Sequence, residues 1–134
     1  MTPIEPAHGL PKRVLIVEDS SLARLYYRNV LEGAGYHVDQ AMNGLEGIEK
    51  ALAEPFDLLI VDVNMPKMDG FSFLQLLRKS DSDAATLPAL VITTEAESQD
   101  LQAARTAGAN FYLVKPVSES DVRAYAAVLM GVRR

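Results

Sequence analysis

Residues 58–62 read Leu-Leu-Ile-Val-Asp, a short continuous apolar run that ends in a carboxylate. Three further runs have the same apolar character: Val14–Val17, Ala89–Ile92 and Phe111–Val114. Continuous apolar runs of this length are typical of strands that are covered on both faces, as in a parallel sheet. The stretch His37–Ala41 is weaker and alternates, as expected of an edge strand. Together these stretches predict five strands.

Helix signals separate the five predicted strands. Capping residues open several of these segments, and glycine or proline follows several of them. The expected helices run from about Ser20 or Ser21 to Glu32, from Asn43 to Glu54, from Gly70 to Lys79, from Glu97 to Ala107, and from Ser118 to Met130. The order is therefore strand–helix repeated five times. It predicts a doubly wound, flavodoxin-like α/β fold with five helices around a five-stranded parallel sheet of order 2-1-3-4-5.

Length and composition bound the class of protein. A chain of 134 residues fits one domain, and we expect residues 1–11 to be a flexible tail and residues 12–134 to be the folded unit. There is no cysteine, which excludes disulfides and thiolate metal sites and suits a cytoplasmic protein. No apolar stretch approaches the ~20 residues of a membrane span. The net charge of −5 disfavours direct binding to nucleic acid.

The polar residues that invite a functional reading lie just past the ends of the predicted strands. Glu18 and Asp19 follow the first strand, Asp62 the third, Thr93 the fourth and Lys115 the fifth. In open parallel sheets, sites form outside the carboxyl ends of the strands, where the strand order reverses. With the order 2-1-3-4-5, this point lies between the first and third strands. The acidic pair should therefore lie beside Asp62.

Three carboxylates in one pocket repel one another, so a positive charge must offset them. Mg²⁺ takes oxygen ligands and binds only one or two carboxylates directly. Lys115 would add a fixed positive charge, and Thr93 a hydroxyl donor. Such a pocket fits phosphoryl transfer onto the Asp62 carboxylate.

At this point the sequence resembles the receiver domain of two-component response regulators. The resemblance covers about Lys12 to Met130, and four motifs at family spacing carry it. They are Val14-Leu15-Ile16-Val17-Glu18-Asp19-Ser20, the stretch from Asp62 to Gly70, Thr93-Thr94-Glu95, and Tyr112-Leu113-Val114-Lys115-Pro116.

The resemblance implies a role for each matching residue. Asp62 would be the phosphoacceptor. Asp19, Asp62 and the backbone carbonyl of Asn64 would bind Mg²⁺, and Glu18 would act mainly through a metal-bound water. Thr93 and Lys115 would contact the phosphoryl oxygens, Tyr112 would be a rotating aromatic switch, and the Lys115–Pro116 bond would be cis.

Two further expectations concern lifetime and output. Asn64 and Glu95 would flank the path of a hydrolytic water and tune how long the phosphoryl group survives. Phosphorylation would change the surface formed by the fourth helix, the fifth strand and the fifth helix. The residues expected on that docking surface are Ala103, Ala104, Arg105 and Ala107.

The favoured reading is a stand-alone, monomeric receiver that catalyses only its own phosphorylation and dephosphorylation. It would receive its phosphoryl group from a histidine kinase or phosphotransfer protein and bind a downstream protein. One alternative is a receiver module cut from a longer regulator or hybrid kinase. The others are enzymes, although a phosphatase would want an aspartate where Asn64 stands, and the Glu18-Asp19 pair would repel a flavodoxin-like phosphate ligand.

Overall fold

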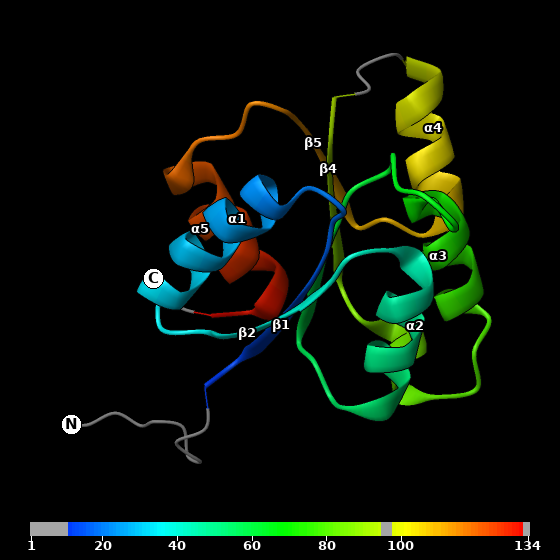
Figure 1. Cartoon of the computed structure of the whole chain (residues 1–134), viewed down its shortest axis with the longest axis horizontal. Coiled ribbons are helices and arrows are strands. Elements are labelled where there is room, and N and C mark those ends of the chain that lie inside the picture. The colour runs from blue at the N-terminus through cyan, green and yellow to red at the C-terminus, as the bar shows by residue number, and fades with distance from the viewer. Residues whose placement is uncertain (1–10, 95–97, 133–134) are drawn as a thin grey trace.

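The computed structural model describes residues 11–94 and 98–132, which are arranged around a five-stranded parallel sheet (Figure 1). The strands are β1 (Arg13–Val17), β2 (His37–Ala41), β3 (Leu58–Val61), β4 (Ala89–Thr93) and β5 (Phe111–Val114). Their order in the sheet is β2-β1-β3-β4-β5, and every neighbouring pair is parallel. The predicted doubly wound fold and strand order are therefore confirmed.

Five helices cover the two faces of the sheet (Figure 1). On one face lie α1 (Ser21–Gly33) and α5 (Glu119–Met130), and on the other lie α2 (Gly44–Ala53), α3 (Gly70–Arg78) and α4 (Ser98–Ala107). A short 3₁₀ helix, η1 (Asp83–Thr86), precedes β4 and was not expected from the sequence. The helix bounds agree with the predicted bounds to within one residue or so.

Side-chain caps determine where several helices begin. Ser20 Oγ accepts a hydrogen bond from the Ala23 N–H at the start of α1, and Asn43 Oδ1 accepts one from the Glu46 N–H at the start of α2. Such caps satisfy N–H groups that have no partner within the helix. At the same helix start, the Glu46 side chain accepts a hydrogen bond from the N–H of Met42.

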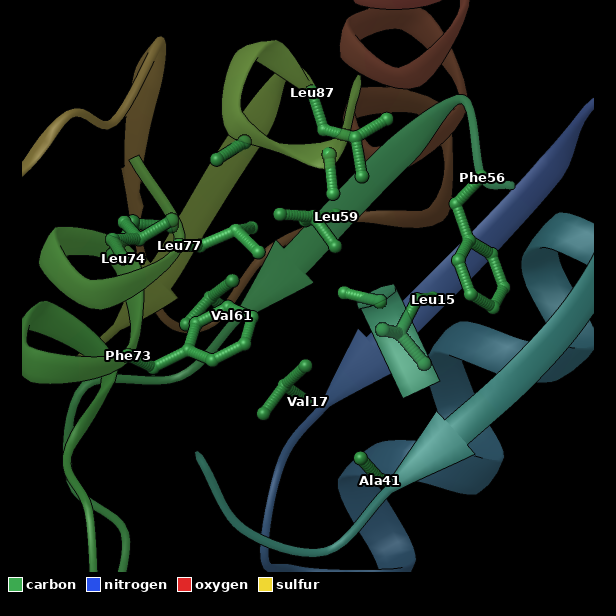
Figure 2. Close-up of a cluster of buried hydrophobic side chains, with 14 of the residues drawn as sticks. Leu15, Val17, Ala41, Phe56, Leu59, Val61, Phe73, Leu74, Leu77 and Leu87 are labelled. Carbon is green, nitrogen blue, oxygen red and sulfur yellow. The ribbon is translucent and has the colours of Figure 1, made fainter. Parts of the chain in front are cut away.

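The core consists of two apolar layers, one on each face of the sheet. Alternating strand residues supply both layers: Leu15 and Val17 point to the α2–α3–α4 side, whereas Val14 and Ile16 point to the α1–α5 side. Figure 2 shows the first layer, in which Phe73 of α3 lies among strand side chains. Because both faces are covered, the central strands carry the continuous apolar runs seen in the sequence.

The β5 strand departs from the prediction of a strand covered on both faces. Phe111 and Val114 are 40% and 41% exposed, while Tyr112 and Leu113 between them are half-buried. The reason is topological: β5 is the last strand of the sheet, so its apolar residues are only partly covered. The Phe111 ring stacks on Tyr125 of α5 at 4.5 Å between centroids, which covers part of it.

The α4 surface also differs from the expectation. Ala104 and Ala107 are buried against the sheet and contribute to the core, so they cannot form a docking surface. Arg105 is exposed and Ala103 is half-exposed. Small residues on α4 let the helix approach the sheet closely, which explains the alanines by packing.

None of the helices in the described part of the chain has the length and apolar character that a membrane span requires.

Candidate metal and phosphoacceptor site

Backbone pairing brings the acidic residues together at the carboxyl ends of β1 and β3. Val17 pairs with Val61, and the Asp62 N–H donates to the Val17 carbonyl at 3.0 Å. Glu18 and Asp62 therefore emerge side by side. Oxygens from the carboxylates of Glu18, Asp19 and Asp62 lie within 4.8 Å of one another. Glu18 is 2% exposed and Asp62 is 7% exposed, whereas Asp19 is exposed to solvent.

Lys115 enters the same pocket from the end of β5. Its N–H donates to the Thr93 carbonyl at 2.7 Å, so the β4–β5 pairing continues to the lysine, and the Lys115–Pro116 peptide bond is cis as expected. Lys115 Nζ lies 3.2 Å from Glu18 Oε1 and 3.7 Å from Asp62 Oδ1. The closer partner of the ammonium in this state is thus Glu18. Thr93, the last residue of β4, is fully buried.

Burial sets the electrostatics of the two shielded carboxylates. It raises the pKa of Glu18, which the Asp62 charge raises further, although the Ser20 N–H and the Lys115 ammonium partly offset the increase. Burial also raises the pKa of Asp62; Lys115 opposes this effect and Asp19 reinforces it. Holding these carboxylates ionised together is therefore unfavourable.

The donor set fits a hard divalent cation. Carboxylate oxygens are the ligands that Mg²⁺ prefers, and one exposed carboxylate leaves room for the waters that this ion keeps. A cation here would offset the repulsion between the carboxylates. The backbone carbonyl of Asn64 remains a predicted additional ligand.

The loop between β3 and α3 brings the start of α3 against the backbone of Asp62. The Gly70 N–H donates to the Val63 carbonyl at 3.0 Å, so the start of α3 lies against the backbone just past Asp62. A Cβ on residue 70 would collide with the Asp62 carbonyl oxygen, which explains why a glycine begins this helix. Lys67 in the same loop has a positive φ of 71°.

Of the remaining predicted site residues, Tyr112 lies apart from the carboxylates, Asn64 lies next to Asp62 in the loop after β3, and Glu95 is not among the described residues. Tyr112 is half-buried on β5 and packs against the apolar layer on the α4 side. It also lines a cavity of about 290 Å³ between α4 and β5. The side chain of Asn64 is exposed in the loop after β3. Glu95 lies outside the described residues.

Two residues near the site were not predicted from the sequence. Arg24 Nη1 donates to the carbonyls of Glu18 and Asp19, at 2.7 and 3.0 Å. Tyr27 is 4% exposed, and burial together with the charges of Glu18 and Asp62 raises the pKa of its phenol. A basic residue in the first turn of α1, where the helix dipole disfavours a cation, is the signal that could have identified Arg24.

Comparison with known proteins agrees with this fold and pocket. The family model for the response regulator receiver domain matches residues 14–127, so the chain belongs to that family, a class of domain in two-component signalling. The chemotaxis protein CheY4 of Vibrio cholerae has a solved structure that superposes with a TM-score of 0.84 at 35% sequence identity. That match covers 89% of this chain and 98% of the other.

Relatives also include segments of much longer signalling proteins. The sensor protein EvgS of Escherichia coli is 34% identical over 125 residues, and a gliding motility regulatory protein of Myxococcus xanthus is 37% identical over 114 residues. The matches cover 92% and 85% of this chain but only 10% and 14% of those relatives. The chain therefore spans a small part of these curated relatives.

One structural neighbour contains a metal. The receiver domain of the sensor histidine kinase PA1611 from Pseudomonas aeruginosa superposes with a TM-score of 0.84 at 24% identity, covering 90% of this chain and 98% of the other. That protein has a magnesium ion coordinated in its active-site cleft. At this identity the likeness shows the shared fold.

Proposed function

We propose that Asp62 accepts a phosphoryl group from the phosphohistidine of a histidine kinase or phosphotransfer protein, and that the modified domain then binds a downstream protein. The observation that carries this proposal is the placement of a buried Asp62 carboxylate beside the Glu18 and Asp19 carboxylates, with Lys115 Nζ 3.7 Å from its Oδ1. A nucleophilic carboxylate, a lysine ammonium and carboxylates that could bind a metal ion lie together in one pocket. This arrangement suits phosphoryl transfer.

In the proposed step, an Asp62 oxygen attacks phosphorus and forms a P–O bond while the P–N bond to the donor histidine breaks. The electron pair of that bond stays on the departing imidazole, which takes up a proton from water. The Lys115 ammonium, which lies closer to Glu18 in the unmodified protein, would turn toward the new phosphoryl oxygens. The Thr93 hydroxyl would donate a hydrogen bond to one of these oxygens. A bound Mg²⁺ would supply neutralisation of the charge on the phosphoryl oxygens.

Asp19, Asp62 and the Asn64 carbonyl would bind that ion directly, and Glu18 would act mainly through a metal-bound water. We also propose that residues 12–134 form the folded unit, a boundary supported by the described elements, which run from Arg13 to Met130. The protein would act on no substrate other than its own carboxylate and aspartyl phosphate. A longer parent protein is equally compatible with this function, because EvgS and its like carry the matched region as a small segment.

The test is incubation with acetyl phosphate and Mg²⁺, followed by intact mass spectrometry. We expect an added phosphoryl group on the wild type, its loss when Mg²⁺ is chelated, and no addition to Asp62→Asn. Asp57→Asn is a matched control, because Asp57 is also an aspartate next to β3 but at its opposite end. Normal modification of Asp62→Asn would refute the assignment.

We further propose that phosphorylation is transmitted to the α4–β5–α5 surface. Thr93 ends β4 and precedes α4, so a donor bond from its hydroxyl to the phosphoryl group would pull on the connection between them. Tyr112 lies beside a cavity lined by Leu101 and Ala104, which gives its ring space to change rotamer. The switch is a two-state equilibrium biased by local charge.

This part of the proposal is tested by NMR, comparing the metal-free form with the Mg²⁺–beryllofluoride form, in which beryllofluoride stands in for the phosphoryl group. We expect shifts at Tyr112 and along Ser98–Ala107. Shifts confined to the neighbours of Asp62 would leave the phosphoacceptor assignment intact and remove the switch.

Asn64 and Glu95 are proposed to tune the lifetime of the phosphoryl group. Asn64 stands two residues after Asp62, and its exposed side chain could orient an approaching water without acting as a strong base. Replacing both residues by alanine should change the dephosphorylation rate measured from the decay of the modified mass. An unchanged rate would contradict this role.

A further inference from the structure

Arg24 makes two hydrogen bonds to the loop between β1 and α1, which carries Glu18 and Asp19. The residue lies in the first turn of α1, four positions after the N-cap Ser20. Its Nη1 donates to the carbonyl of Glu18 at 2.7 Å and to that of Asp19 at 3.0 Å. Helix side chains lean toward the helix N-terminus, which carries the guanidinium back over the loop that precedes the helix.

The two carbonyls belong to the two peptide planes that flank the Cα of Asp19. Because each peptide is planar, the orientations of these planes define the φ and ψ of Asp19 and hence the direction of its Cα–Cβ bond. One guanidinium nitrogen bonded to both carbonyls therefore restrains the direction in which the Asp19 side chain leaves the backbone.

Asp19 needs such a restraint more than its two partners do. Glu18 is buried, its carboxylate accepts bonds from the Ser20 N–H and Lys115 Nζ, and its own N–H donates to Ala41 at 3.0 Å. Asp62 is buried at the end of the central strand β3. Asp19 is exposed and stands in the loop between β1 and α1, where burial does not restrict it.

We propose that Arg24 is a positioning residue that aims the Asp19 carboxylate into the metal site. This inference rests on the proposed function, since it concerns the affinity of the same site for Mg²⁺. Arg24 touches neither the ion nor the phosphoryl group in this role. Its charge alone would oppose metal binding, because a neighbouring divalent cation disfavours a positive charge.

The two effects of Arg24 on a cation have opposite signs, which makes the test decisive. If the guanidinium acted only as a charge, removing it would tighten Mg²⁺ binding. If it positions Asp19, removing it weakens Mg²⁺ binding. Partners that orient metal ligands commonly contribute ~10–100-fold to affinity, and an effect transmitted through the backbone should be smaller, about 3–10-fold.

The experiment measures Mg²⁺ affinity by NMR titration of the full chain at constant ionic strength, with thermal stability recorded in parallel. We expect Arg24→Ala to raise the Kd by about 3–10-fold. Arg24→Lys, which keeps a charged donor, should recover much of the loss. Arg28→Ala is the matched control: it removes an exposed arginine one turn further along α1, which pairs with Glu32, and should leave the Kd unchanged.

A second readout needs no metal. In the metal-free protein, the amide order parameters of Asp19 and Ser20 should fall in Arg24→Ala and remain at the wild-type value in Arg28→Ala. Should Arg24→Ala not fold, Arg24→Gln gives the same comparison with a neutral donor and an expected Kd increase of about twofold or more.

An unchanged or lower Kd in Arg24→Ala, or in Arg24→Gln where that variant replaces it, would overturn the positioning role. Failure of the proposed function looks different: the wild type itself would then bind no Mg²⁺ or gain no phosphoryl group on Asp62. Asp19→Ala serves as the reference for complete loss of this ligand, and its Kd should exceed that of every Arg24 variant.

Discussion

At the scale of single residues, burial and mutual repulsion make the ionised carboxylates of the metal-free site unfavourable. Burial raises the pKa of Asp62, and the neighbouring Asp19 carboxylate adds to the increase. The folded chain therefore binds this proton more tightly than the unfolded chain does. As pH rises from the ordinary value of an aspartate through the raised pKa, ionisation lowers the free energy of unfolding, and the loss is complete above the raised pKa.

Because ionisation of Asp62 lowers the free energy of unfolding, the variant Asp62→Asn, whose amide does not ionise, should be more stable than the wild type. In metal-free buffer at pH 7 the variant should unfold at a higher temperature than the wild type, by roughly 3–6 °C if about 1 kcal/mol is relieved. The difference in unfolding temperature between the variant and the wild type should become smaller toward pH 4. It should also become smaller on adding Mg²⁺, which stabilises the wild type. Thermal unfolding followed by circular dichroism checks this.

The exposed aspartate variant Asp81→Asn provides the control, since Asp81 lies far from the pocket in sequence and is solvated. It should unfold at the wild-type temperature at both pH values. A lower unfolding temperature for metal-free Asp62→Asn at pH 7 would show that the carboxylate contributes net stability and would contradict the argument from repulsion.

At the scale of elements, Arg78 at the end of α3 joins three segments. Its Nε and Nη2 donate to the Gly108 carbonyl at 3.1 and 2.7 Å, and its Nη1 donates to the Ala85 carbonyl at 3.1 Å. Gly108 ends α4 with a positive φ of 105° and lies against the arginine stem. The C-terminal end of α4 is thus anchored to α3 and η1, on the side away from Thr93.

We predict that Arg78→Ala lowers the free energy of unfolding by about 2–3 kcal/mol, because hydrogen bonds from a charged donor are lost and partly buried carbonyls lose their partner. Urea unfolding monitored by circular dichroism measures the change. Lys79→Ala alters the next residue, whose side chain is exposed, and should cost less than about 0.5 kcal/mol. Equal effects of the two substitutions would argue against the anchoring role.

At the scale of the whole molecule, charge and surface bear on self-association. The net charge is −5. Net charge of one sign disfavours association of identical chains. We therefore predict a monomer, with and without beryllofluoride.

Size-exclusion chromatography with light scattering measures this, and the expected mass is 14.6 kDa in both states. Repeating the run at raised ionic strength controls for repulsion between chains. A mass near twice that value in the beryllofluoride form alone would show that the modified state pairs with itself, and the prediction would be wrong.

The order of strands and helices could be predicted from the sequence, and so could the neighbourhood of the acidic residues. Central strands buried on both faces must be apolar at every position, so Val14–Val17 and Leu58–Val61 could be recognised directly. Polar residues immediately after such runs must lie at the carboxyl edge of a parallel sheet. The sequence therefore predicts that Glu18 and Asp62 lie together, because strand pairing fixes their neighbourhood.

Contacts between side chains of distant elements could not be predicted from the sequence. Lys115 lies closer to Glu18 than to Asp62, and this depends on how its side chain extends past the ends of the intervening strands β4 and β3. The contact of Arg24 with the loop before its helix, and the partial exposure of β5, are likewise absent from local patterns. The physical reason is that periodicity reports which face of an element is apolar. It does not report which distant element covers that face, or leaves it open at the edge of the sheet.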